Sequence, residues 1–291
     1  MALLVFDIGG TFIKFGVWDN DTIKNGGKFE TPDNWQTLKE KMLETKISFE
    51  KKYSLEGVAF SVPGSPNSEK GVIEGESLVD YLHNFPIYQE LTEMFHLPVE
   101  FENDANCAAL AEISQKSDED KSNILFIVLG TGIGGSLIIN NEIINGFNNY
   151  AGEFGFMLID GEEFNFGELA TAVAMEKRYA DRKQLLHNQV RAEEIFELAL
   201  DGDEDAKIEV DKFYYYLTIG LYNLTTILNP NKIIIGGGVS SLEGFKERIE
   251  DEFYNLYQRI NHFPYFPTIE VSSFKNEANL IGAVINFNNK K

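Results

Sequence analysis

Two glycine-rich segments hold the residues best suited to chemistry in this sequence. The first, Asp7-Ile8-Gly9-Gly10-Thr11, follows an apolar run at 3–6, and the second, Gly130-Thr131-Gly132-Ile133-Gly134-Gly135, follows one at 124–129. Each pattern predicts a strand, a tight turn and another strand. Glycine permits close backbone approach, so bare N–H groups in such turns can converge on an anion. The pair therefore predicts a phosphate held between two related halves of the chain.

The first turn also carries charged groups suited to a nucleotide phosphate. The Asp7 carboxylate stands where its strand ends and can hold Mg²⁺ directly or through water. Gly9, Gly10 and Thr11 offer N–H and hydroxyl donors, and Lys14 adds a positive charge. An ordinary β-hairpin turn is the alternative, because Gly-Gly is common there.

The second segment also satisfies G-x-G-x-x-G, the pattern of dinucleotide-binding proteins. That pattern requires a helix to begin at the glycines, whereas Ser136-Leu137-Ile138-Ile139 has a strand pattern. We therefore interpret Gly130, Thr131, Gly132 and Gly134 as a second phosphate-binding hairpin.

A third glycine run, Gly236-Gly237-Gly238, follows apolar residues at 233–235 and precedes an expected helix. Backbone without side chains lets a flat adenosine lie against it. A tight turn from strand to helix is the alternative interpretation.

Candidate catalytic and sugar-binding groups lie between and after the phosphate turns. In Glu102-Asn103-Asp104-Ala105-Asn106, either Asn103 or Asp104 could serve only as a helix N-cap. A carboxylate at the carboxyl end of a strand can instead accept a proton from a substrate hydroxyl. Phosphoryl transfer needs little beyond such a base, in-line positioning and charge neutralisation. In Ala151-Gly152-Glu153-Phe154-Gly155-Phe156 and at Glu168, the carboxylates suit sugar hydroxyls, with ordinary solvated glutamate as the alternative.

Strands and helices must position these segments, and the hydrophobic pattern predicts both. In the first half we expect strands at 2–6, 12–18, 22–29, 57–62 and 97–101 and helices at 35–47, 87–95 and 105–113. In the second half we expect strands at 124–129, 136–140, 142–144, 232–235 and 268–271 and helices at 168–182, 191–200, 204–228, 242–259 and 277–287.

The order of these elements predicts the architecture. Alternating strands and helices indicate an α/β fold, and two halves that open on the same three-strand pattern indicate a duplicated pair of domains. We expect an N-terminal domain at 1–117 and a C-terminal domain at 118–276, joined by a polar linker at 114–122. The C-terminal helix, 277–291, is a candidate to pack back on the first domain.

The composition narrows the classes of partner. The chain has 291 residues, 43% of them hydrophobic, and a formal net charge of −21. So negative a charge argues against nucleic acid and anionic membranes as partners. The single cysteine, Cys107, excludes an intramolecular disulfide and a cysteine cluster for zinc. No apolar stretch approaches the ~18 residues of a membrane span, so we expect a cytoplasmic protein.

Taken together, these segments resemble the ROK family of sugar kinases and repressors over nearly the whole chain. The resemblance implies a two-domain actin-like (ribonuclease H-like) ATPase fold with the active site in the interdomain cleft. Mg²⁺ and ATP would lie between the two glycine hairpins, with adenosine near Gly236-Gly237-Gly238. Asp104 would be the catalytic base, and Asn103, Glu153 and Glu168 would hold the sugar.

Two departures from the family pattern refine this expectation. Phe156 stands where ROK enzymes usually have a histidine, and no cysteine follows Cys107, so we expect no structural zinc. This combination is similar to the β-glucoside kinase branch, which phosphorylates the 6-hydroxyl of the non-reducing glucose in cellobiose and related compounds. An aromatic ring at Phe156 would offer a stacking surface to a second glucose or an aryl aglycone.

Other functions stay open. The same chemistry on glucose or N-acetylmannosamine is the nearer alternative, and a non-catalytic sugar sensor is the remote one. The family's repressors carry a helix-turn-helix domain before the first phosphate motif, whereas here that motif begins at residue 7. Together with the negative charge, this favours catalysis over DNA binding. A homodimer is compatible with the sequence.

Overall fold

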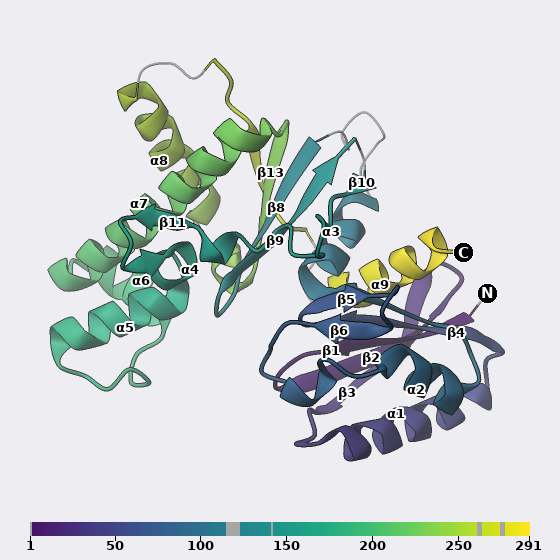
Figure 1. Ribbon diagram of the computed structural model, residues 1–291. Helices are drawn as coiled ribbons and strands as arrows, with labels where there is room; N and C mark the ends of the chain where they lie inside the picture. Colours follow the sequence, from purple (N-terminus) through teal and green to yellow (C-terminus); the bar gives the residue numbers. More distant parts are fainter. Residues whose placement is uncertain (1, 115–122, 141, 261–263, 274–276) are drawn as a thin grey trace. The chain divides into compact units, whose positions relative to one another are not determined.

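The computed structural model describes residues 2–114, 123–140, 142–260, 264–273 and 277–291 (Figure 1). The chain forms two compact units. The first unit contains residues 1–116, 147–150 and 274–291, and the second contains residues 117–146 and 151–273. Apart from Ser114, the predicted linker at 114–122 lies outside the described residues. In the part of the chain that is described, no helix is both long enough and apolar enough to cross a bilayer.

The first unit is built on a five-stranded sheet in the order β3-β2-β1-β4-β7. Its strands are β1 (Ala2–Ile8), β2 (Phe12–Asp19), β3 (Thr22–Glu30), β4 (Leu55–Val62) and β7 (Val99–Asn103). Its helices are α1 (Trp35–Glu50), α2 (Ile87–Phe95), α3 (Asp104–Ser114) and α9 (Ala278–Asn289). A small hairpin of β5 (Ser65–Asn67) and β6 (Val72–Glu74), followed by the short helix η1 (Asp80–Leu82), completes it. β1 runs parallel to β4, which runs parallel to β7, while β2 is antiparallel to β1.

The alternation of side chains along β1 fills the two faces of this sheet. Leu4, Phe6 and Ile8 pack with α1 and α2 on one face, where the Phe6 and Phe60 rings stack with centroids 5.4 Å apart. Leu3 and Val5 lie on the opposite face and pack with α9. Because strand side chains alternate, the next residue on that second face is Asp7. The fold thus directs a carboxylate towards the side covered by α9.

Helix α9 lies unusually close to α3 because of one glycine. A Cβ built on Gly282 would lie 1.8 Å from the carbonyl oxygen of Cys107 in α3. Only a residue without a side chain allows that approach. Leu280, Ala283 and Val284 then bury the neighbouring apolar surface.

The second unit repeats the same strand order, as β10-β9-β8-β13-β14. Its main strands are β8 (Asn123–Leu129), β9 (Ile133–Ile139), β10 (Glu142–Ile143), β13 (Lys232–Gly236) and β14 (Thr268–Val271). Its helices are α4 (Phe166–Leu169), α5 (Ala172–Lys183), α6 (Ala192–Leu200), α7 (Glu204–Leu228) and α8 (Phe245–Arg259). The short helices η3 (Phe154–Phe156) and η4 (Gly238–Ser241) and the two-stranded pair β11 (Leu158–Asp160) and β12 (Phe164–Asn165) lie between them.

The predicted α/β fold class and most of the predicted elements are confirmed, with three corrections. The helix expected at 168–182 is two helices, α4 and α5, because Thr171 caps α5 by accepting a hydrogen bond from Ala174 N. The strand expected at 136–140 begins at Ile133, so Gly134 and Gly135 belong to β9 rather than to the turn. The helix expected from 242 begins at Phe245, after Gly244 in the left-handed conformation.

Replacing Gly282 by alanine should destabilise the first unit. The added Cβ would collide with the backbone of α3, so the two helices must separate. Overpacking of this kind costs about 1–3 kcal/mol, which lowers the midpoint of urea or thermal unfolding. Gly26→Ala is the matched control, since the nearest contact of its Cβ is the Phe15 carbonyl oxygen at an ordinary 3.5 Å. Equal midpoints for the two variants would contradict the close packing of α9 on α3.

Candidate functional site

In the first unit, strand register gathers polar groups around Asp7. Asp7 pairs with Lys14 on β2 and with Ser61 on β4. The buried Ser61 hydroxyl donates to Asp7 Oδ1 at 2.9 Å, and Lys14 Nζ lies 3.7 Å from Asp7 Oδ2. A third group comes from α9, where Asn279 Nδ2 donates to Asp7 Oδ1 at 3.0 Å. The sequence pointed to Asp7 and Lys14 but not to Ser61 or Asn279.

The turn after β1 leaves backbone open for an anion. The Gly9 N–H is used within the turn, donating to the Phe12 carbonyl at 3.2 Å, and Thr31 Oγ1 donates to the Gly9 carbonyl at 2.6 Å. Gly10 and Thr11 are exposed. The structure therefore brings Asp7, the turn and Lys14 together at one β-hairpin, as a phosphate site requires.

The carboxyl end of β7 lies two strands from β1 and leads directly into α3. Asn103 caps this helix, because its Oδ1 accepts from Ala105 N at 2.9 Å and from Asn106 N at 3.2 Å. Its amide donates to the Gly64 carbonyl at 3.0 Å. Asp104, the first residue of α3, is exposed. Of the two residues that could cap this helix, Asn103 has that role.

Glu102 and Asn106 stabilise the turn between β7 and α3 through buried hydrogen bonds. Glu102 Oε1 accepts from Asn103 N at 2.8 Å and from Asn106 Nδ2 at 3.0 Å, and both side chains are buried. A buried, hydrogen-bonded carboxylate of this kind fixes the backbone ahead of Asp104. Neither residue was assigned a role from the sequence.

In the second unit, two glycine turns meet at one edge of the sheet. The exposed turn 130–132 is closed by Gly130 N donating to the Gly132 carbonyl at 3.0 Å. β13 runs parallel to β8, with Gly236 beside Val128, so its turn lies next to this one. Gly237 has φ +99° and a Cβ there would lie 2.0 Å from the Leu129 carbonyl oxygen. Gly237 is therefore needed for packing, while Gly238 has open space around it.

The segment 152–156 packs closely on β9 because Gly135, Gly152 and Gly155 have no side chains. A Cβ on Gly152 would lie 2.3 Å from the Gly135 carbonyl oxygen, and one on Gly155 would lie 2.6 Å from that of Ile133. The Phe154 ring is buried against Gly135. Between these anchors Glu153 is exposed, yet neighbouring atoms desolvate its carboxyl and raise its pKa.

Phe156 is exposed to solvent, whereas Phe154 is buried. Its side chain is 75% exposed, whereas Phe154 is 6% exposed. An aromatic ring this open is costly to leave in water, and it offers a face for stacking. The sequence expectation of an available ring at this position is compatible with that exposure.

Glu168 lies on α4, close to the segment that carries Glu153. A Cβ on Gly167 would lie 3.5 Å from the Gly155 carbonyl oxygen, so α4 and this segment are in contact. Glu168 also has a structural task, because its Oε2 accepts from Asn165 N at 3.0 Å in a reciprocal capping box. Arg178 Nη1 donates to the Leu169 carbonyl at 2.9 Å and holds the end of α4. Glu153, Phe156 and Glu168 are thus gathered on one unit.

The donor set around Asp7 fits a magnesium ion that arrives with a nucleotide. Mg²⁺ in nucleotide sites keeps several waters and takes one or two protein carboxylates besides phosphate. Asp7 supplies one such carboxylate beside an exposed glycine turn. Within the described ranges, no group of three or more His, Cys, Asp or Glu side chains is arranged to hold a metal ion by itself.

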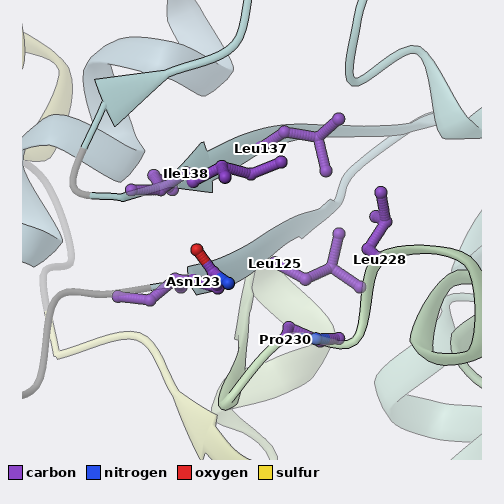
Figure 2. Close-up of a pocket in the computed structure, with 8 residues that line it drawn as sticks. Asn123, Leu125, Leu137, Ile138, Leu228 and Pro230 are labelled. Atoms are coloured by element: carbon purple, nitrogen blue, oxygen red, sulfur yellow. The ribbon is translucent and has the colours of Figure 1, made fainter.

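A small pocket in the second unit lies away from these residues (Figure 2). It is lined mainly by apolar side chains, including Leu125, Ile138 and Leu228, and its volume of about 10 Å³ admits one water. Sites for small molecules are commonly ~300–1,000 Å³. Asn123 lines it at the start of β8, whereas the glycine turn follows the end of that strand. The pocket therefore has no part in the candidate site.

Comparison with known proteins identifies the relatives of this chain. The model of the ROK family matches residues 3–290. A β-glucoside kinase of Klebsiella pneumoniae is 34% identical, with 99% of this chain and 96% of that protein covered. A β-glucoside kinase of Listeria monocytogenes is 31% identical, with 99% and 97% covered. The crystal structure of a ROK family protein from Streptococcus pneumoniae in complex with sucrose has a TM-score of 0.89 at 31% identity, with 100% and 99% covered. The predicted resemblance and the actin-like fold are confirmed.

The raised pKa of Glu153 predicts a pH-dependent difference between wild type and Glu153→Gln. A carboxyl whose pKa is higher in the folded chain stabilises the fold below its unfolded pKa, and this contribution is lost as pH rises through the folded pKa. The glutamine variant stays neutral, so its unfolding temperature relative to wild type should be higher at about pH 7 than at about pH 4. Glu162→Gln, an exposed neighbour, is the control. An identical difference at both pH values would contradict the desolvation of Glu153.

Proposed function

Because the chain belongs to the ROK family, we propose that it is an ATP-dependent kinase that phosphorylates the 6-hydroxyl of the non-reducing glucose in β-glucosides such as cellobiose. A ROK family glucokinase from Streptomyces griseus has been crystallised with glucose and AMPPNP, an analogue of ATP. The two compact units would be the two domains of the enzyme. The observation that carries the choice of sugar is the exposed Phe156 ring on the same unit as Glu153 and Glu168.

The comparisons support this choice. The relatives from K. pneumoniae and L. monocytogenes are β-glucoside kinases, and the S. pneumoniae protein was crystallised with a disaccharide, sucrose. A disaccharide needs a second surface beyond the groups that hold the phosphorylated sugar. An exposed aromatic ring supplies such a surface, because sugars present C–H faces that pack on aromatic rings. We assign that role to Phe156.

The first unit supplies the proton acceptor. Asp104 stands at the start of α3, and Asn103 fixes the turn by capping the helix and bonding to Gly64. In the proposed reaction the sugar O6 forms a bond to the γ-phosphorus as the bond to the β,γ-bridging oxygen breaks, and the hydroxyl proton passes to Asp104. Asn103 retains one amide N–H for a sugar hydroxyl, since the other is bonded to Gly64.

The remaining residues would hold the nucleotide and the sugar. Asp7 would bind Mg²⁺, which neutralises phosphate charge when present, and Gly10, Thr11 and Lys14 would bind phosphate. Gly9 would shape this turn, because its N–H donates to the Phe12 carbonyl. The phosphate would also contact the second hairpin, which contains Gly130, Thr131, Gly132 and Gly134. Adenosine would lie against Gly236, Gly237 and Gly238. The sugar hydroxyls would bind Glu153 and Glu168. No role is assigned to structural zinc.

A panel of acceptors tests the proposed substrate class. With ATP and Mg²⁺, ADP release should give a higher kcat/KM for cellobiose, gentiobiose and an aryl β-glucoside than for glucose, N-acetylmannosamine or N-acetylglucosamine. Phe156→Ala should lower kcat/KM for the β-glucosides about tenfold, the loss of roughly 1–1.5 kcal/mol expected for an aromatic contact, and should leave glucose unchanged. Tyr254→Ala removes an exposed ring on α8 and serves as the control. A wild-type preference for free glucose would overturn the proposal.

Asp104→Asn should slow transfer strongly while leaving nucleotide binding intact. The amide cannot accept the proton, so kcat should fall by about 10²–10⁴-fold, the usual contribution of a general base. The dissociation constant for ADP, measured by calorimetry, should not change. Asp21→Asn, in the exposed turn between β2 and β3, is the control. Retention of most of the wild-type kcat by Asp104→Asn would move the base to another residue.

A further inference from the structure

We propose that Asn279, in the first turn of α9, is a positioning residue that orients the Asp7 carboxylate towards a magnesium nucleotide. The inference rests on the proposed kinase function and goes beyond it. It assigns a role in phosphate handling to a helix from the far end of the chain. Asn279 is separated from Asp7 by 272 positions in the sequence.

The two carboxylate oxygens of Asp7 have different neighbours. Oδ1 accepts from Ser61 Oγ at 2.9 Å and from Asn279 Nδ2 at 3.0 Å. Two donors at hydrogen-bond distance occupy the two lone-pair directions of one carboxylate oxygen. Oδ2 lies 3.7 Å from Lys14 Nζ. The pair of donors therefore holds Oδ1, and Oδ2 is the oxygen on the Lys14 side.

Both donors are neutral, and this matters for a metal ligand. A cation bonded to Oδ1 would further offset the negative charge that attracts Mg²⁺. A hydroxyl and an amide orient the carboxylate without adding to the positive charge that Lys14 Nζ already places 3.7 Å from Oδ2. The Asp7 side chain is buried, with only 9% of it exposed, so solvent does little to orient it. Protein donors must therefore hold its rotamer.

The helix itself is held in register by the residues that share a face with Asn279. Gly282 and Asn286 follow at i+3 and i+7, which places all three on one side of α9. Gly282 rests on the Cys107 backbone in α3, and the buried Asn286 donates to the Phe101 carbonyl on β7 at 3.2 Å. One helix face therefore touches Asp7, the helix that begins at Asp104 and the strand before it. That geometry makes Asn279 a fixed donor rather than a mobile surface amide.

The test measures metal–nucleotide binding directly. The probe is Mn²⁺ with ADP, followed by calorimetry and by the electron paramagnetic resonance of Mn²⁺, with no sugar present. Asn279→Ala should weaken Mn²⁺ binding in the ADP complex by about 10–100-fold, the usual effect of removing a partner of a metal ligand. In the kinase assay, kcat should fall while KM for the sugar stays constant. Asn279→Gln, which keeps an amide donor, should lose less than the alanine variant.

Two further variants separate positioning from simple support of the fold. Asn286→Ala removes a buried bond of the same helix and should lower the unfolding temperature without weakening Mn²⁺ binding. Asn288→Ala, exposed on α9, should change neither. In an Asp7→Asn background, Asn279→Ala should have no additional effect on Mn²⁺ binding, because its action passes through that carboxylate.

The possible failures are distinguishable. If wild type binds Mn²⁺ with ADP and Asn279→Ala binds it equally well, the positioning role is wrong and the proposed kinase function stands. Additive losses in the Asp7→Asn background would likewise overturn the role. If wild type does not bind Mn²⁺ with ADP at all, the proposed function fails, and this inference fails with it.

Discussion

The parallel register of β1, β4 and β7 is the constraint on which the first unit depends. It sets Asp7 beside Ser61 and Ser61 beside Glu102, so three strands far apart in sequence end at the same edge of the sheet. Parallel strands need crossover connections, and here the crossovers contain α1 and α2, which cover one face of the sheet. The opposite face is covered by α9. A slip of one residue in any of these pairings would turn the polar groups into the opposite core.

The second unit uses the same strand order but ends its parallel strands differently. Its parallel pair, β8 and β13, ends in glycine turns rather than in carboxylates. At Gly135, Gly152, Gly155 and Gly237 a side chain would collide with backbone, so these glycines bring segments together. Gly132 and Gly238 have open space instead. The glycines of this unit thus fall into two groups, those that close packing requires and those whose surroundings would admit a side chain.

Local patterns in the sequence were enough to predict the strands of the two five-stranded sheets, the glycine turns and the long helix α7, but not the short pairs β5–β6 and β11–β12. They could not show that Ser61 and Asn279 bond to Asp7, because those contacts depend on strand register and on how α9 packs. The division of the helix expected at 168–182 was missed because Thr171 caps a new helix in the middle of a helical pattern. For Asn103 the local signal was correct but ambiguous, and only the backbone geometry assigns it as the cap of α3.

The placement of α9 also has a consequence for how the chain is assembled. This helix follows the whole second unit in sequence, yet its apolar face completes the core of the first. During synthesis, residues 1–116 emerge with one face of their sheet packed against α3 but not yet against α9, and they remain so until more than 150 further residues have been added. The first unit is therefore the first to be synthesised and the last to complete its core. A chaperone that shields the sheet before α9 is synthesised would act on the surface that α9 later covers.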